Sequence, residues 1–438
     1  HANVRDNQFD KALEDNYTLG NVMQLLGYKT IAIGKWGVQG YSKWSENGDE
    51  WPAVPTERGF DTFYGYMRHG DGHEHYPNEG LHGGKKEVYQ DTTAITSGLD
   101  KSYTGDLFTA KAKQYIIDHK NGENSDDPFF MYLSLDTPHA VLHLPTQAYP
   151  DGFGLNGGLK WLGEEGKMIN TASGEPDSWV DPEYADATYD DDNNPDTPQV
   201  PWPNVNKRYA TVVKRIDNQV QDVIQLLKDL KIDENTLVVF TSDNGVSRES
   251  YLKNQPFNPN FFESFGNFDG IKRDVWEGGV RVPTVAYWPG TIAPGTIVNN
   301  PSIAYDWMPT FTDLAGYNGP VRSDGVSLLP RLTGEKDQKD SSIYIEYFNP
   351  RNTPDYPEFL DEHRGRIRGQ MQMVRIGDTL GIRYNIQSHN DDFEIYDITN
   401  DPKQSNNLNS TSNLSKLDKR FKEKVTQMRM ADTSAPRP

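Results

Sequence analysis

The sequence predicts an α/β fold in which helices cover a large, mostly parallel sheet and a small antiparallel α+β subdomain follows. Short apolar runs alternate with stretches of helical periodicity through most of the 438 residues, which is typical of strand–helix–strand units. After residue 338, closely spaced strand-like segments replace this pattern, as expected for an antiparallel sheet. We therefore expect an α/β domain over residues 1–338 and an antiparallel subdomain over residues 339–438.

Four apolar runs are the predicted strands of the large sheet. They are TIAIG (30–34), PFFMYLSL (128–135), TLVVFTS (236–242) and VPTVAYWPG (282–290). Each run is continuously apolar, so we expect both of its faces to be buried, as in parallel strands that helices cover on both sides.

Two helices are predicted to cover this sheet, and a polar helix over residues 414–430 is predicted to close the chain. The first covering helix follows Thr18, a residue type that favours helix N-caps, and ends at Leu26 before Gly27. The second carries apolar residues three and four positions apart, which predicts one buried stripe. The stripe consists of Val213, Ile216, Val220, Val223, Ile224, Leu227 and Leu230.

Two further regions differ in composition from the predicted sheet. Residues 149–203 are rich in Gly, Pro, Asp and Asn, which indicates surface loops of a length that is often functional. The runs QMQMVRIGD, LGIRYNI and DFEIYDI are the predicted strands of the antiparallel subdomain.

The composition excludes several classes of protein and site. The formal net charge is -20 at pH 7, and such a surface repels nucleic acid. The sequence contains no cysteine, which excludes disulfides, zinc–thiolate sites and a cysteine nucleophile within it. No apolar run reaches the roughly 20 residues that a membrane-spanning helix needs. The first residue is His1, so we expect that a signal peptide was removed or that the sequence is truncated.

Polar residues follow the predicted strands at the edge of the sheet where ligands bind in open α/β folds. Lys35 follows the first strand, His139 the second, and Asp243 and Asn244 the third. Lys272 precedes a glycine turn and the fourth strand. Carboxylate and amide oxygens suit Ca²⁺ or Mg²⁺, and cationic side chains stabilise developing negative charge. The alternative interpretation is an Asp-Asn-Gly turn with solvated lysines and a structural histidine.

Seven segments resemble, in their order along the chain, motifs of the type I sulfatases, the formylglycine-dependent branch of the alkaline phosphatase superfamily. They are GYKTIAIGKWG, TPHAVLHLP, TSDNG, KRDVWEGGVRVP, AYDWMPTFTDLAG, DGVSLLPRLTG and FEIYDITNDPKQSNNL. The resemblance implies hydrolysis of sulfate esters by a formylglycine hydrate with bound Ca²⁺, or alternatively Mg²⁺. It also implies a sulfated carbohydrate as substrate and a secreted or periplasmic protein, while the oligomeric state is not predicted.

The resemblance implies a role for each residue at the strand ends. Asp243 and Asn244 would be metal ligands, and Lys35 and Lys272 would bind sulfate oxygens. His139 would contact the ester and protonate the leaving alcohol, since an imidazole that titrates near neutrality suits this work.

The sequence departs from the family pattern in its nucleophile. The Cys/Ser-x-Pro-x-Arg motif that yields formylglycine is absent from the printed residues, as is the first strand of the family fold. We therefore expect an N-terminal segment with the nucleophile to lie outside the printed sequence.

A second departure is Gly37, where many family members have a histidine that helps to expel sulfate from the covalent intermediate. The stretch FYGYMRHGDGHEHYP (63–77) is rich in histidine, and our hypothesis is that His73 or His75 takes over the catalytic task, with His73 predicted as catalytic. The alternative is that these histidines bind sugar or form an ordinary loop. The predicted substrate-binding residues are Arg68, His75 and His143.

Two alternative functions stay open at this point. The same scaffold supports phosphoester and phosphonate hydrolysis, and fold alone does not separate these activities. A sulfated-glycan binding protein without a nucleophile would also agree with the printed residues.

Overall fold

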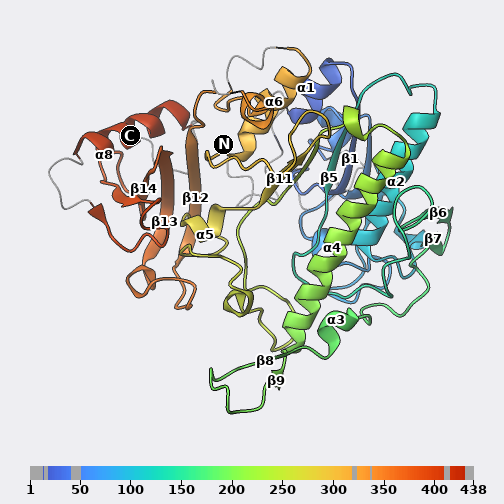
Figure 1. Cartoon of the computed structure of the whole chain (residues 1–438), viewed down its shortest axis with the longest axis horizontal. Helices are drawn as coiled ribbons and strands as arrows, with labels where there is room; N and C mark the ends of the chain where they lie inside the picture. Colours follow the sequence, from blue (N-terminus) through green and yellow to red (C-terminus); the bar gives the residue numbers. More distant parts are fainter. Residues whose placement is uncertain are drawn as a thin grey trace. The chain divides into compact units, whose positions relative to one another are not determined.

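The computed structural model describes residues 13, 18–40, 51–317, 323–335, 338–408 and 415–429. These residues form two compact units (Figure 1). The N-terminal unit comprises the described residues up to 236 together with 248–257, and the C-terminal unit comprises 237–247 and the described residues from 258 onward. The predicted boundary at residue 338 falls within the C-terminal unit and stays a prediction.

The N-terminal unit contains a five-stranded sheet in the order β4-β3-β2-β1-β5. Its strands are β1 (Lys29–Lys35), β2 (Thr62–Tyr66), β3 (Val88–Gln90), β4 (Thr93–Ala94) and β5 (Phe129–Ser134). β1 pairs in parallel with both β2 and β5, whereas the β2–β3 and β3–β4 pairs are antiparallel. The predicted α/β fold is confirmed, with a mixed sheet.

Two glycines draw the three parallel strands together at the end of β1. A Cβ atom on Gly34 would lie 2.0 Å from the Ser134 carbonyl oxygen of β5, and one on Gly65 would lie 1.9 Å from the Gly34 carbonyl oxygen. Both residues also have positive φ angles, 103° and 156°, which a side chain disfavours. Larger residues here would therefore push apart the strand ends that carry Lys35.

The predicted burial of both strand faces is correct for β1 and wrong for three other strands. Ile33 is fully buried, but Tyr132 of β5 is 45% exposed and Val285 of β11 (Thr284–Tyr287) is 59% exposed. Among the described residues, β1 has a partner strand on each side, whereas β5 pairs with β1 alone. Among the described residues, β11 and β10 (Val238–Thr241), whose Phe240 is 37% exposed, pair only with each other, in antiparallel orientation. The prediction that these two strands belong to the large sheet is therefore wrong.

Helix α1 (Leu19–Leu25) confirms the helix predicted after Thr18. The Thr18 hydroxyl oxygen accepts a hydrogen bond from the Asn21 N–H at 3.1 Å, and the Asn21 side chain accepts one from the Thr18 N–H at 3.2 Å. This reciprocal pair is a capping box. Gly27 ends the turn with a φ of 86°, as the sequence predicted.

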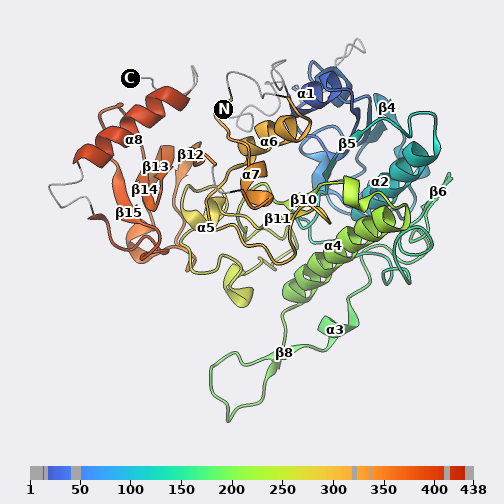
Figure 2. The ribbon, with the colours of Figure 1, turned by 45° about the horizontal axis from the view of Figure 1, so that its top comes forward.

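Helices α2 (Thr104–Asn121) and α4 (Asn204–Asp229) lie side by side in both views (Figures 1 and 2). The predicted stripe on α4 is partly wrong, because Val213 is 41% exposed while Arg215 and Asp222 are buried. The Arg215 Nε lies 2.8 Å from the Asp106 Oδ1 of α2, and the Lys113 Nζ lies 2.6 Å from the Asp222 Oδ1. Pairing with α2 thus lets charged side chains occupy the buried face of α4.

The predicted loop-rich stretch 149–203 is confirmed. Its regular elements are short: β6 (Trp161–Glu164), β7 (Lys167–Ile169), α3 (Pro182–Ala185), β8 (Thr188–Tyr189) and β9 (Val200–Pro201). They form two two-stranded ribbons, β6–β7 and β8–β9, and one short helix.

The C-terminal unit contains the predicted antiparallel sheet, in the order β12-β13-β14-β15. Its strands are β12 (Ile343–Asn352), β13 (Ile367–Ile376), β14 (Thr379–Arg383) and β15 (Glu394–Asp397). The predicted closing helix is α8 (Ser415–Met428), whose Phe421 and Val425 pack with Val374 and Ile395 of the sheet. The unit also contains α5 (Glu277–Val280), α6 (Trp307–Leu314) and α7 (Leu329–Leu332).

The remaining regular elements are single turns of 3₁₀ helix. They are η1 (Pro55–Arg58), η2 (Asp71–His73), η3 (Thr96–Gly98), η4 (Asp233–Asn235), η5 (Pro259–Phe262), η6 (Ala304–Asp306) and η7 (Asp361–His363). In the part of the chain that the structure describes, no helix is both long and apolar enough to cross a bilayer.

Candidate functional site

The ends of β1 and β2 position Lys35 in the N-terminal unit. Lys35 pairs with Tyr66 in the parallel register, and the Gly37 N–H then donates to the Met67 carbonyl oxygen at 3.0 Å. The Lys35 side chain runs closely past the loop that follows β2, because a Cβ atom on Gly72 would lie only 2.6 Å from the Lys35 Cδ. The absence of a side chain at Gly72 therefore makes room for the lysine.

Four rings gather in the same unit, from the loop after β2, the loop after β5 and the segment 248–257. The imidazoles of His73 and His139 stack in parallel, with centroids 4.8 Å apart and an interplanar angle of 3°. The ring of His69 stands edge-on to that of His73 at 5.1 Å. The Tyr251 ring lies 5.6 Å from His73 and 6.2 Å from His139. The structure thus brings together two predicted catalytic histidines that are 66 residues apart in the sequence.

His69 is a residue of this cluster that the sequence analysis did not single out. A Cβ atom on Gly37 would lie 3.7 Å from the Cβ of His69, so His69 packs directly against the glycine. The His73 ring in turn contacts the His69 ring. The histidine-rich stretch after β2 pointed to this region, but the contact between residues 37 and 69 is visible only in the fold.

His75 supports the cluster from the protein interior. It is fully buried, with its Nδ1 3.0 Å from the Asp136 Oδ2 and 3.2 Å from the Thr104 Oγ1. Its Nε2 lies 3.2 Å from the His139 carbonyl oxygen. Although burial favours the neutral ring, the Asp136 carboxylate and these hydrogen bonds raise the pKa of His75 above its ordinary value. A protonated His75 can donate from both ring nitrogens and hold the backbone of His139 in place.

The other predicted substrate-binding residues have partners within the protein. His143 is buried, and this burial lowers its pKa to about 2, so the ring is neutral. The Arg68 guanidinium forms two hydrogen bonds with the Asp71 carboxylate, at 2.7 and 3.0 Å, and is partly exposed. The interior positions of His75 and His143 give no support to the predicted substrate contacts, which stay predictions.

The C-terminal unit brings the remaining predicted residues together after β10. The Gly245 N–H donates to the Gly279 carbonyl oxygen at 2.9 Å, and the Lys272 N–H donates to the Val246 carbonyl oxygen at 2.8 Å. These bonds place the backbone of Lys272 beside the segment that carries Asp243 and Asn244.

The glycine after Asp243 and Asn244 has a packing role. A Cβ atom on Gly245 would lie 2.0 Å from the Gly278 carbonyl oxygen. The glycine at this position is thus required by the close approach of two chain segments, in addition to any function of the two polar side chains before it.

Asp243 and Asn244 fit part of a Ca²⁺ site. The Asp243 side chain is exposed and Asn244 is half-buried, and both offer the hard oxygen donors that Ca²⁺ and Mg²⁺ prefer. Ca²⁺ takes about six to eight oxygen ligands, so these two residues do not complete a coordination shell. Within the described residues, no group of three or more His, Asp or Glu side chains is placed to hold a metal ion.

Two protein-family models match the chain. A model described as Sulfatase matches residues 2–317, and a model described as N-sulphoglucosamine sulphohydrolase, C-terminal, matches residues 263–431. Together they span both units of the structure.

Curated relatives match over parts of their length. N-acetylgalactosamine-6-sulfatase of Canis lupus familiaris is 40% identical over 129 residues, which are 29% of this chain and 23% of the relative. The uncharacterized sulfatase YdeN of Escherichia coli (strain K12) is 26% identical over 376 residues, which are 80% of this chain and 53% of the relative. The chain thus spans about half or less of the length of these relatives.

Solved structures share the fold at low sequence identity. Ps i-CgsB in complex with k-i-k-neocarrahexaose matches with a TM-score of 0.63 and 19% identity, over 96% of this chain and 78% of that chain. BT4656 in complex with its substrate D-glucosamine-2-N, 6-O-disulfate matches with a TM-score of 0.54 and 18% identity, over 97% of this chain and 85% of that chain.

Proposed function

Because this chain belongs to the sulfatase family, we propose that it hydrolyses sulfate esters and that its substrate is a sulfated carbohydrate. The observation that carries the proposal is the parallel stack of His73 and His139 in the unit where Lys35 ends a central strand. Two proteins of the same fold are described in complex with sugars, which supports a carbohydrate substrate. We also propose that the protein acts in the periplasm or after secretion, where it would encounter large glycans.

Lysine side chains attract the anionic substrate in this proposal, Lys35 in the N-terminal unit and Lys272 in the C-terminal unit. The formal net charge of -20 repels an anionic substrate at long range, so the site itself must supply positive charge. Lys35 and Lys272 provide ammonium groups that attract sulfate oxygens and stabilise the charge that develops as the ester breaks.

His139 is the proposed general acid for the leaving alcohol. Its Nδ1 lies 2.6 Å from the Ala140 carbonyl oxygen, so Nδ1 carries the hydrogen of that bond and Nε2 is the nitrogen that exchanges a proton with substrate. The buried His75 holds the His139 carbonyl oxygen from the other side, which fixes the position of the ring.

His73 is the proposed partner of His139 in acid–base catalysis. Two protonated rings at a centroid distance of 4.8 Å repel each other, and Lys35 adds positive charge in the same region. We therefore expect one ring to carry a proton while the other is neutral. Such a pair supplies a general acid and a general base at the same pH.

The family resemblance implies a formylglycine hydrate, which would supply an oxygen nucleophile, and a Ca²⁺ ion, which would polarise sulfate oxygens. Asp243 and Asn244 are the described residues that would hold the ion. Lys35 binds sulfate oxygens and the histidine cluster transfers protons, whether the bound ion is Ca²⁺ or Mg²⁺.

A comparison of sulfate and phosphate release tests the proposed function. The full-length protein is incubated with sulfated oligosaccharides and with paired aryl sulfate and aryl phosphate esters, and free anions are quantified by ion chromatography. We expect release of sulfate, with little phosphate. Preferential release of phosphate would favour phosphoester hydrolysis, and tight glycan binding without release of either anion would favour a binding protein.

A further inference from the structure

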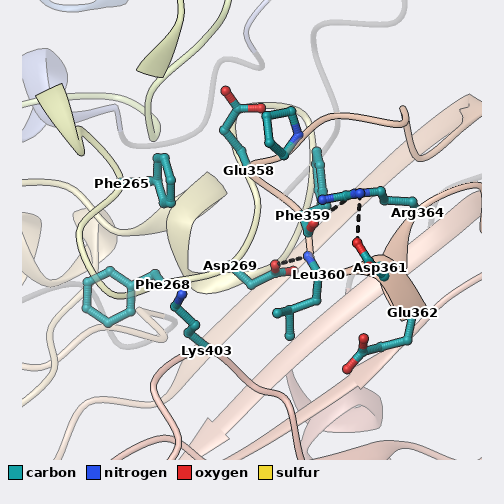
Figure 3. Close-up of a pocket in the computed structure, with 11 residues that line it drawn as sticks. Phe265, Phe268, Asp269, Glu358, Phe359, Leu360, Asp361, Glu362, Arg364 and Lys403 are labelled. Carbon is teal, nitrogen blue, oxygen red and sulfur yellow. Dashed lines mark hydrogen bonds and ion pairs between the residues drawn. The ribbon is translucent and has the colours of Figure 1, made fainter. Parts of the chain in front are cut away.

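A pocket of about 260 Å³ lies in the C-terminal unit, next to the segment that carries Lys272 (Figure 3). Three parts of the chain line it: residues 265, 268 and 269, residues 357–362 and 364, and Lys403. We propose that this pocket binds one neutral sugar ring of the glycan. The inference rests on the proposed carbohydrate substrate and adds to it an unsulfated ring at a defined place.

Aromatic and aliphatic side chains form the apolar walls of the pocket. Figure 3 shows the phenyl rings of Phe265 and Phe268 on one side, with Phe359 and Leu360 on the other. The Arg281 guanidinium lies 4.3 Å from the centroid of the Phe268 ring, which steadies that ring. Flat apolar walls of this kind pack against the C–H face of a sugar ring, and a few polar groups then fix its orientation.

The polar side chains of the pocket favour a neutral ligand over a sulfated one. Four carboxylates line it, from Asp269, Glu358, Asp361 and Glu362, against the two cations Arg364 and Lys403. Ionised carboxylates accept hydrogen bonds from sugar hydroxyl groups. A sulfate group would meet an excess of negative charge, and like charges brought together at a binding site are strongly unfavourable.

The two cations of the pocket have different roles. The Arg364 Nη1 lies 2.7 Å from the Asp361 Oδ1, and its Nε donates to the Phe359 carbonyl oxygen at 2.9 Å. Arg364 therefore stabilises the loop itself. Lys403 is exposed, and Figure 3 shows its ammonium group directed toward Phe268. We expect Lys403 to donate a hydrogen bond to an oxygen of the bound sugar.

A buried pair ties the two sides of the pocket together. Asp269 accepts hydrogen bonds from the Leu360 N–H at 2.6 Å and from the His363 Nδ1 at 2.8 Å. The His363 ring stacks on Trp276 with centroids 3.8 Å apart. Because these contacts join residue 269 to residues 360 and 363 within the protein itself, little ordering of this part of the pocket is needed on binding.

The volume and the position of the pocket suit one sugar ring of a longer glycan. Its volume of about 260 Å³ is just below the lower end, roughly 300 Å³, of pockets for drug-sized ligands. Asp269 precedes Lys272 by three residues, so their Cα atoms lie within about 11 Å of each other. A short oligosaccharide can therefore place a neutral ring in the pocket while its sulfated neighbour lies near Lys272.

Ligand-observed NMR with the full-length protein tests this proposal. The probes are methyl β-D-galactopyranoside and D-galactose 6-sulfate, and saturation transfer from protein to sugar is measured by titration. We expect the neutral sugar to bind, and the double substitution Phe265→Ala with Phe268→Ala to weaken its binding about tenfold. Phe262→Ala is the matched control, since Phe262 lies in the same part of the chain but does not line the pocket.

Charge substitutions at exposed positions keep the test independent of folding. Lys403→Gln should weaken binding of the neutral sugar severalfold, and Glu362→Gln should improve binding of the sulfated sugar. Weaker binding of the sulfated sugar in the double phenylalanine variant than in Phe262→Ala, or unchanged binding of the neutral sugar in both pocket variants, would overturn the proposal. Sulfate release is measured in a separate experiment, so a failure of this pocket to bind sugar would not contradict the proposed function.

Discussion

The two groups of candidate site residues differ in how firmly the chain holds them. In the N-terminal unit, His139 is fixed by the buried His75 and stacked on His73. In the C-terminal unit, Asp243 is exposed, and backbone hydrogen bonds of Gly245 and Val246 hold the segment that follows it. Proton transfer needs a fixed geometry before substrate arrives, whereas a metal ligand gains its geometry when the ion binds. The difference thus matches the different tasks of the two groups.

His139→Ala should produce the largest effect on turnover. Loss of a general acid costs about 10² to 10⁴ in rate, and the loss should be greatest for a sugar ester, whose alcohol leaves poorly without a proton. An aryl sulfate with a good leaving group should be less affected. The matched control is His119→Ala, a histidine on α2 outside the cluster. Equal losses on both substrates would show that His139 does not act as the acid.

Asp136→Asn should produce the largest effect on stability, because it removes the carboxylate partner of the buried His75. Breaking a buried ion pair costs about 3–5 kcal/mol, measurable by urea unfolding. The control is Asp127→Asn, whose partner Lys29 is exposed and whose loss should cost less than about 1 kcal/mol. A small loss of stability in Asp136→Asn would mean that the histidine cluster is held no more firmly than the Asp243 region.

The stability of the protein should also depend on pH through His75. Its pKa is raised in the folded chain above the ordinary 6.5, so its contribution is complete below about pH 6.5 and declines as the pH rises through the higher folded-state pKa. Asp136→Asn should abolish this part of the pH dependence. Unfolding measured from about pH 5.5 to about pH 9 shows whether it does.

Calcium should stabilise the protein through Asp243. At a hundredfold excess over its dissociation constant, Ca²⁺ should raise the free energy of unfolding by about 2.7 kcal/mol. Asp243→Ala should abolish this gain while changing stability without Ca²⁺ by less than about 0.5 kcal/mol, since the side chain is exposed. Asp378→Ala, at another exposed position of the same unit, is the control. Retention of the calcium effect in Asp243→Ala would place the ion elsewhere.

Gly72→Ala should produce a smaller and more local effect, on Lys35 alone. The added methyl group would lie 2.6 Å from the Lys35 Cδ, and displacing the lysine should lower kcat/KM for sulfate esters about tenfold. Gly70→Ala is a close control, because nothing lies within 4 Å of its Cβ position. Equal activity of the two variants would mean that the exact position of Lys35 matters little.

The sequence predicted the elements whose residues carry their own pattern. Apolar runs predicted β1, β5 and β10, Thr18 predicted the start of α1, and the polar residues after these three strands predicted Lys35, His139 and Asp243 as candidates. The buried face of α4 was not predictable from periodicity, because Arg215 is buried only through its pair with Asp106.

Other features depend on contacts between distant parts of the chain. Helix α2 was not predicted, since its buried face includes Thr104, Asp106 and Lys113 and lacks a clear apolar stripe. His69 was missed because its place beside Gly37 follows from the pairing of β1 with β2. The positions of such residues can be determined only from the fold, whereas the residue types at strand ends can be read from the sequence.

The most direct test measures desulfated sugar and free sulfate in the same single-turnover reaction of the full-length protein with a sulfated oligosaccharide. The account predicts equal amounts of both products in the unaltered protein and a slow appearance of both in His139→Ala. In His73→Ala it predicts desulfated sugar first, with free sulfate appearing later, because His73 acts after the sugar leaves. Normal release of sulfate in both variants would contradict the assignment of the stacked histidines as the acid–base pair.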